Sequence, residues 1–157
     1  MRTLHIGLRV EDLERSVEFY ENLGYEVVGT VPATELGDLT MLKLSDDDVV
    51  RLELVHKPDA GRINPRGLSH LVIQVEDLVP TVTRLRACGI HVDQPSSPDG
   101  SDDFLTTMLT DPDGYRIELV QWPVGHADGM TDADFQGEAP PPRQAHEDPS
   151  DRLEPQS

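Results

Sequence analysis

The chain has 157 residues, with 30 acidic side chains against 13 basic ones and a formal net charge of −17. This length fits one ordinary domain, or two small modules that share a core. Nucleic acid and anionic membrane surfaces are bound by basic faces, so the charge argues against both partners. The single cysteine, Cys88, excludes an internal disulfide and fits a reducing compartment.

The N-terminus runs directly into a predicted strand, without the apolar stretch of a secretory leader. No apolar run approaches the length of about 18 residues that spans a bilayer. We therefore expect a soluble, cytoplasmic protein.

Residues 3–10 alternate between apolar and other side chains, which is typical of a half-buried strand. One face is expected to join the core, and it carries Leu4, Ile6, Leu8 and Val10.

A helix is expected next, with Asp12 as its N-cap and Gly24 at the position where helices commonly end. Strands are then predicted over residues 25–31, 40–44 and 49–55. The order of elements in the first half is therefore β-α-β-β-β.

The second half repeats this order. A strand is predicted over 70–75, a helix between Asp77 and Gly89, and strands over 90–92, 104–110 and 115–121. The sequence of residues 111–114, Asp-Pro-Asp-Gly, predicts a tight hairpin turn before the last strand. Cys88 matches Leu23 of the first half, so we expect a packed thiol.

These patterns predict an α+β fold made of two tandem β-α-β-β-β modules. The modules span residues 1–57 and 68–123, and a linker rich in Pro, Gly and Arg joins them over 58–67. Residues 124–157 are acidic and Pro-rich with few aliphatic side chains, so they are predicted to form a disordered tail.

The repeat also duplicates residues that carry chemistry. His5 and Glu53 of the first half recur as His70 and Glu118, each at an offset of 65 residues (70 − 5 and 118 − 53). A duplicated fold needs only its apolar pattern repeated. A repeated His and Glu therefore indicate a function.

Alternation places all four polar side chains on the strand faces opposite the core. If the first and last strands of a module pair, its His and Glu become neighbours. Two imidazoles and two carboxylates suit a divalent ion such as Zn²⁺, Ni²⁺, Co²⁺, Mn²⁺ or Fe²⁺. Such an ion would polarise a carbonyl and stabilise an enediolate while a Glu moves the proton.

The four other histidines lack counterparts at this offset and are not expected to be ligands: His56, His91, His126 and His146. Arg51 and Arg116 also repeat, and we expect them to face solvent or line the barrel, with anion binding as the alternative. The aromatic residues Phe19, Tyr20 and Trp122 are expected to pack at a helix or module interface.

Residues 1–122 resemble the vicinal oxygen chelate superfamily, and within it the short bacterial glyoxalase I (lactoylglutathione lyase). The resemblance is strongest in Leu4-His5, in Leu8-Arg9-Val10 with Asp12 to Ser16, and in Asp111 to Leu119. It implies the paired-module fold of that superfamily. It also implies a homodimer whose sites form between subunits.

In this family the residues matching His5, Glu53, His70 and Glu118 bind the metal, with Ni²⁺ or Co²⁺ often preferred over Zn²⁺. The family reaction isomerises the hemithioacetal of an α-oxoaldehyde and a thiol, and Glu118 and Glu53 are the candidate bases. Arg9 matches a residue that binds the glutathione carboxylates.

One departure concerns the family's basic loop, which is replaced here by residues 98–103 with three aspartates. Such a loop would repel a glutathione carboxylate, so another thiol stays open. Two other classes are also compatible with the scaffold. One is a different metalloenzyme, such as an epimerase, a dioxygenase or an antibiotic-modifying enzyme, and the other is a non-catalytic resistance protein that sequesters its ligand.

Overall fold

The computed structural model describes residues 2–126 and 129–130. The first half contains one helix and four strands, which are β1 (Ile6–Val10), α1 (Leu13–Leu23), β2 (Tyr25–Thr34), β3 (Gly37–Leu44) and β4 (Leu52–His56). A short 3-10 helix at Pro65–Gly67 precedes the second half. That half contains β5 (Leu71–Gln74), α2 (Leu78–Ala87), β6 (Leu105–Thr110) and β7 (Arg116–Gln121).

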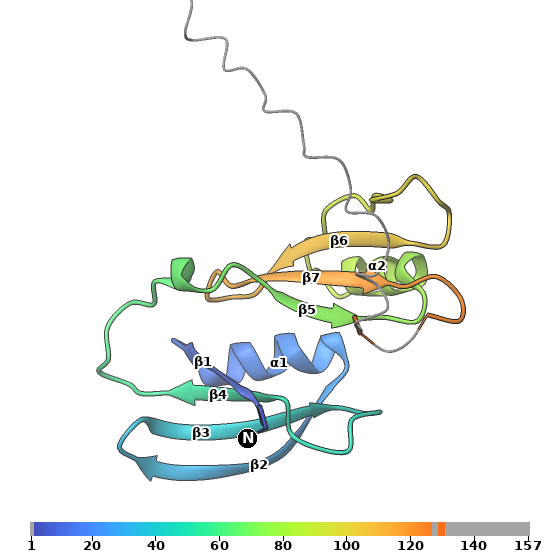
Figure 1. The fold of residues 1–157 in the computed structure, drawn as a ribbon. Coiled ribbons are helices and arrows are strands. Elements are labelled where there is room, and N and C mark those ends of the chain that lie inside the picture. The colour runs from blue at the N-terminus through green and yellow to red at the C-terminus, as the bar shows by residue number, and fades with distance from the viewer. Residues whose placement is uncertain (1, 127–128, 131–157) are drawn as a thin grey trace, which may run out of the picture. The chain divides into compact units, whose positions relative to one another are not determined.

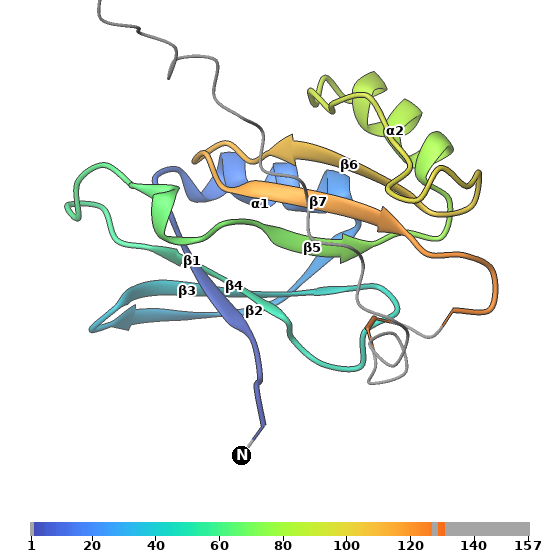
Figure 2. The ribbon, with the colours of Figure 1, turned by 45° about the horizontal axis from the view of Figure 1, so that its top comes forward.

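Each half builds its own sheet, as Figures 1 and 2 show. The first sheet has the strand order β1-β4-β3-β2, and the second has the order β5-β7-β6. In both sheets the first and last strands of the half pair in parallel. The sequence repeat thus has a structural counterpart, because Gly7 lies opposite Glu53 and Val72 lies opposite Glu118.

The two helices begin and end close to where their sequences predict. Asp12 caps α1, its side chain accepting a hydrogen bond from the backbone N–H of Arg15 at 3.0 Å. Gly24 ends the helix with a left-handed backbone (φ 104°), which favours glycine. Asp77 occupies the same position before α2, although its side chain accepts no capping hydrogen bond there.

The prediction of a strand over residues 90–92 is wrong. The structure has two isolated bridges in this region, Val92 with Leu109 and Ser96 with Thr106. Pro95 lies between the bridged residues, and proline has no N–H to donate to a ladder. The segment therefore follows β6 without forming a regular strand.

Two predictions about burial are also wrong. Leu4 and Ile6 do not join the core and are 64% and 41% exposed. Leu4 precedes the edge strand β1 and Ile6 is its first residue, and only Leu8 and Val10 farther along it are buried. The Cys88 thiol is exposed rather than packed, because α2 ends at Ala87 and Cys88 falls beyond its buried face.

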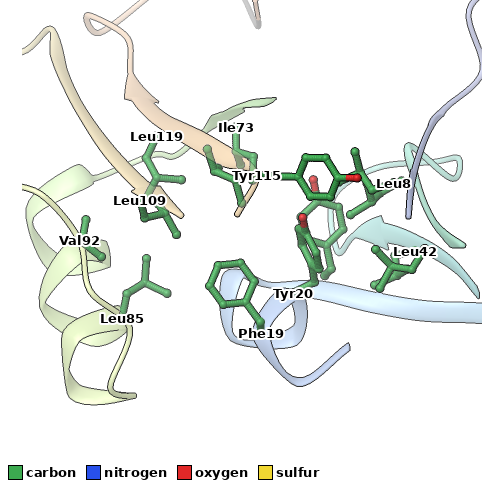
Figure 3. Close-up of a cluster of buried hydrophobic side chains, with 14 of the residues drawn as sticks. Leu8, Phe19, Tyr20, Leu42, Ile73, Leu85, Val92, Leu109, Tyr115 and Leu119 are labelled. Carbon is green, nitrogen blue, oxygen red and sulfur yellow. The ribbon is translucent and has the colours of Figure 1, made fainter. Parts of the chain in front are cut away.

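Side chains from both halves form one hydrophobic cluster (Figure 3). Leu8 and Leu42 enter it from the first sheet, and residues such as Ile73 and Leu119 enter it from the second. Phe19 and Tyr20 of α1 belong to the same cluster, with their rings edge to face at 5.3 Å. These two aromatic residues pack as predicted. Trp122 stacks on Phe104 instead, at 5.1 Å.

The turn between β6 and β7 binds the first half through hydrogen bonds. Asp111 is 4% exposed, and its Oδ2 accepts the Tyr20 hydroxyl at 2.9 Å. Its Oδ1 accepts the backbone N–H groups of Asp113 and Tyr115. Burial raises the pKa values of both Asp111 and Tyr20, so the Tyr20 hydroxyl keeps its proton.

Asp113 extends this contact to the start of α1. Its carboxylate accepts hydrogen bonds from the Ser16 hydroxyl at 3.0 Å and from the Glu11 backbone N–H at 3.1 Å. The predicted hairpin turn is present, and it also joins the second sheet to α1.

Among the described residues no helix is long and apolar enough to cross a membrane. Most of the predicted acidic tail lies outside the described residues. The boundaries proposed for the two modules and the linker stay predictions.

Candidate functional site

The first His–Glu pair lies where β1 and β4 run side by side. His5 directly precedes β1, and Glu53 is the second residue of β4. The His5 Nε2 atom lies 3.4 Å from Glu53 Oε2. The Glu53 side chain is only 10% exposed, whereas that of His5 is 33% exposed. The sequence prediction that these two residues become neighbours is met.

The second pair reproduces this arrangement between β5 and β7. His70 precedes β5, and Glu118 is the third residue of β7. The His70 Nε2 atom lies 3.4 Å from Glu118 Oε2, and the Glu118 side chain is 26% exposed. The Ser69 hydroxyl lies 3.1 Å from His70 Nδ1, which orients the ring so that Nε2 faces the carboxylate.

The spacing within each pair suits two ligands of one ion. Imidazole nitrogen and carboxylate oxygen bind divalent ions at about 2.0 to 2.2 Å, which separates adjacent ligand atoms by about 3.0 to 3.5 Å. Both observed contacts of 3.4 Å fall in this range. The residues present therefore fit a divalent metal, in donor chemistry and in spacing.

One chain does not bring the two pairs together. Within residues 2–126 and 129–130, no three His, Cys, Asp or Glu side chains gather closely enough to hold an ion. Each half contributes two ligands, fewer than the four of a closed structural zinc site or the three of a catalytic one. Either pair alone is therefore an incomplete set of ligands for such a site.

A cavity of about 400 Å³ lies beside the first pair. It is lined by residues from the starts of both parallel strand pairs, including His5, Arg51 and Val72. Arg51 and Arg116 are exposed, as predicted. The lining of the cavity also includes the exposed apolar residues Leu4 and Ile6.

Arg9 lies on the same face of β1 as His5, four residues farther along the strand. It lines a second cavity of about 340 Å³ together with Lys57 and Arg62. The Arg9 guanidinium is held in place by the backbone carbonyls of Ala60 and Gly61, at 3.2 and 3.3 Å. Glu11 also lines this cavity, so the three cations leave its lining net positive, which favours an anionic ligand group.

The loop over residues 98–103 is acidic and largely exposed. Hydrogen bonds from Ser101 lower the pKa of Asp99, which further favours its charged form. The loop precedes β6, and the cavity that Arg9 lines contains none of its residues.

The remaining histidines lie away from both pairs. His56 ends β4, His91 lies 3.5 Å from Asp93, and His126 stacks on Trp122. None of them joins a group of three potential ligands within the part of the chain that the structure describes. His146 lies outside the described residues.

Two features of the site were not predicted. Arg62 adds a third cation to the cavity around Arg9. Gly7 lies directly opposite Glu53, and its missing side chain leaves room for the carboxylate. A signal for Gly7 was present, since it alternates with His5 and Arg9 on the polar face of the strand.

Residues 2–119 match the model of the Glyoxalase/Bleomycin resistance protein/Dioxygenase superfamily. The chain is 32% identical over 126 residues to a lactoylglutathione lyase of Neisseria meningitidis, which covers 77% of this chain and 91% of that protein. It is 30% identical over 125 residues to a lactoylglutathione lyase of Haemophilus influenzae, covering 77% and 93%. Its fold is similar to that of the trypanothione-dependent glyoxalase I of Leishmania major, with a TM-score of 0.63, 31% identity and coverage of 77% and 86%.

Proposed function

Because this chain belongs to the glyoxalase/bleomycin resistance protein/dioxygenase superfamily, with the α+β fold expected of it, we propose that it is a metal-dependent lyase of the glyoxalase I type. Its substrate is the hemithioacetal that an α-oxoaldehyde forms with a thiol. Its product is the corresponding S-2-hydroxyacyl thiol. The observation that carries this proposal is the pair of matching His–Glu contacts, each at 3.4 Å.

The proposed metal ligands are His5 and Glu53 from one subunit and His70 and Glu118 from the other. This assignment explains why the described part of one chain gathers only one His and one Glu at each place. It also gives a role to β1 and β5, the outer strands of their sheets, which carry the exposed apolar residues Ile6 and Val72. Burying these edges in a homodimer would remove apolar surface from water.

A divalent ion held by the proposed ligands would supply positive charge that polarises a carbonyl of the substrate. The proton transfer falls to the protein. A Glu carboxylate takes the proton from the carbon that bears sulfur and returns it to the neighbouring carbonyl carbon, while the hydroxyl proton on the first carbon moves to the oxygen of the second. The first carbon rises to the oxidation level of a thioester and the second falls to that of an alcohol, so no external oxidant is needed.

Glu118 is the better placed of the two candidate bases. Its side chain is 26% exposed, against 10% for Glu53, so it reaches a substrate with less rearrangement. Glu53 is enclosed by its neighbours and is better suited to stay a fixed ligand.

Arg9 would bind a carboxylate of the thiol, assisted by Lys57 and Arg62 around the same cavity. The acidic loop over residues 98–103 has no basic side chain that could bind a second carboxylate of the thiol. The thiol is therefore expected to be anionic at one end, and glutathione is the first one to test. A cytoplasmic location and a role in removing methylglyoxal are parts of the same proposal.

The direct test measures thioester formation from methylglyoxal and glutathione with protein reconstituted in Ni²⁺, Co²⁺ or Zn²⁺. We expect turnover with at least one ion and its loss after chelation, because the polarising charge is then removed. Metal content is measured on the same samples. Ion binding without turnover would redirect the search to other thiols, and absence of both would reject the proposal.

Mixing two inactive variants tests whether the site is shared. His5→Ala damages the first half and His70→Ala damages the second, so each homodimer has only damaged sites. A mixed dimer contains one intact site, formed by the undamaged half of each chain. Random exchange makes half of the dimers mixed, so about a quarter of the wild-type activity should return.

The control for this mixture uses His5→Ala with Glu53→Ala, which damage the same half. No mixed dimer of these two variants has an intact site. Recovery in the first mixture and none in the second supports the shared site. Equal behaviour of the two mixtures contradicts it.

A further inference from the structure

Gly7 has an unusual position for a glycine. It lies within β1, in register opposite Glu53 of β4. A Cβ atom built at this position would lie 3.2 Å from Glu53 Oε1 and 3.7 Å from Val55 Cγ2. The first distance is shorter than an ordinary van der Waals contact, so the carboxylate occupies space that any other residue would fill.

The backbone does not explain this glycine. Its φ is not among the positive values of the chain, and it forms part of a regular parallel ladder. Glycine inside a strand weakens the strand, since it loses more entropy on folding and has no side chain to pack. A glycine at this position is instead explained by the space that it leaves for the Glu53 carboxylate.

The second half shows that the repeat does not itself require a glycine. Val72 occupies the matching position, opposite Glu118. Glu118 is also the more exposed carboxylate, at 26% against 10% for Glu53. The two Glu residues thus have different surroundings on otherwise matching strands.

Glu53 has little freedom to move away from a new neighbour. It lies on the central strand β4, between Gly7 on β1 and Met41 on β3. The whole residue is 8% exposed. A methyl group at position 7 would therefore push the carboxylate by a few tenths of an ångström, relative to His5.

We propose that Gly7 is a positioning residue for the metal ligand Glu53. The space left by its missing side chain lets the Glu53 carboxylate lie 3.4 Å from His5, in the spacing that one ion requires. Metal–ligand distances tolerate deviations of about 0.2 Å, so a shift of this size weakens the bond. The inference rests on the proposed function, since it takes Glu53 to be a ligand.

The test compares Gly7→Ala with the wild-type protein by titration with Ni²⁺ and Co²⁺ against a competing chelator. We expect Gly7→Ala to lower metal affinity about 10-fold, as for other groups that orient a ligand. The absorption spectrum of the Co²⁺ form should also change, because it reports the geometry around the ion.

Gly29→Ala is the matched control. Gly29 lies in the same row of the first sheet, opposite Met41, and a Cβ there would meet nothing within 4 Å. We expect this variant to bind metal like the wild-type protein. It accounts for any general effect of replacing a strand glycine.

A double-mutant cycle separates positioning from damage to the fold. In the Glu53→Ala background the methyl group at position 7 has room, so adding Gly7→Ala should change metal affinity by less than about twofold. Thermal unfolding of the metal-free variants shows whether each one folds.

The outcomes are distinguishable. If the wild-type protein binds no divalent ion, the proposed function fails before Gly7 is tested. If the wild-type protein binds an ion and Gly7→Ala binds it equally well with an unchanged Co²⁺ spectrum, the proposed function stands and the positioning role of Gly7 is wrong. An equal loss of affinity in both backgrounds would also overturn that role.

Discussion

Replacing Glu118 by Gln is expected to lower kcat about 10³-fold while the protein stays folded. Gln keeps the shape of the side chain but cannot accept the substrate proton, and a positioned general base contributes about 10² to 10⁴ in rate. The measurement is thioester formation at saturating substrate, with metal content determined on the same sample.

Glu53→Gln is the matched comparison. Glu53 is the more enclosed carboxylate, so its replacement is expected to reduce metal affinity first. Saturating metal should then restore part of the activity of Glu53→Gln and none of that of Glu118→Gln. Wild-type kcat in Glu118→Gln would rule out this residue as the base.

Asp111→Ala is expected to lower the free energy of unfolding by about 3 kcal/mol, because it leaves buried hydrogen-bond donors without partners. Asp111 accepts the Tyr20 hydroxyl and two backbone N–H groups, and it is 4% exposed. Urea unfolding at pH 7 measures the loss.

Asp111→Asn supplies the control for charge. Its amide oxygen still accepts the two backbone N–H groups, and its amide nitrogen can donate to the Tyr20 oxygen. Burial raises the pKa of Asp111 in the folded protein, so the folded state binds this proton more tightly than the unfolded state.

The sign of the pH dependence follows. The contribution of Asp111 to stability is fully present below its unfolded pKa and declines as pH rises through the folded pKa. Asp111→Asn should therefore gain stability relative to the wild-type protein as pH rises through this interval. A constant difference between the two proteins across the acid range would contradict the raised pKa.

Sequence reasoning identified the two His–Glu pairs because two of the signals are local. Alternation placed His5 and Glu53 on the polar faces of their strands, and the constant offset predicted the same for His70 and Glu118. Neither signal needs knowledge of distant contacts. The parallel pairing that makes each His and Glu neighbours is a distant contact, which the sequence offered only as a condition and the structure shows.

The wrong predictions depended on where elements end. Leu4 and Ile6 follow the apolar alternation, yet they lie just before and at the first residue of an edge strand, where the core does not reach. Cys88 keeps helical spacing with Leu85, yet the helix has already ended. Sequence patterns specify periodicity better than they specify boundaries.

The role of Asp111 could not be predicted for a different reason. Its residue type and position were explained by the hairpin turn alone. Its partner Tyr20 lies 91 residues away in the sequence, and one sequence offers no signal for such a contact. The same holds for Asp113 and Ser16.

If the two His–Glu pairs of each chain are metal ligands, as proposed, their separation within the chain ties metal uptake to assembly. Under the proposed arrangement an isolated subunit has only two donors for an ion, whereas an assembled dimer offers four. By thermodynamic linkage, the ion then strengthens subunit association by the factor by which association strengthens ion binding. Dilution, which dissociates the dimer, would therefore promote release of the metal, and chelation of the metal would promote dissociation of the dimer. The cellular abundance of the protein would help set how much of it carries metal.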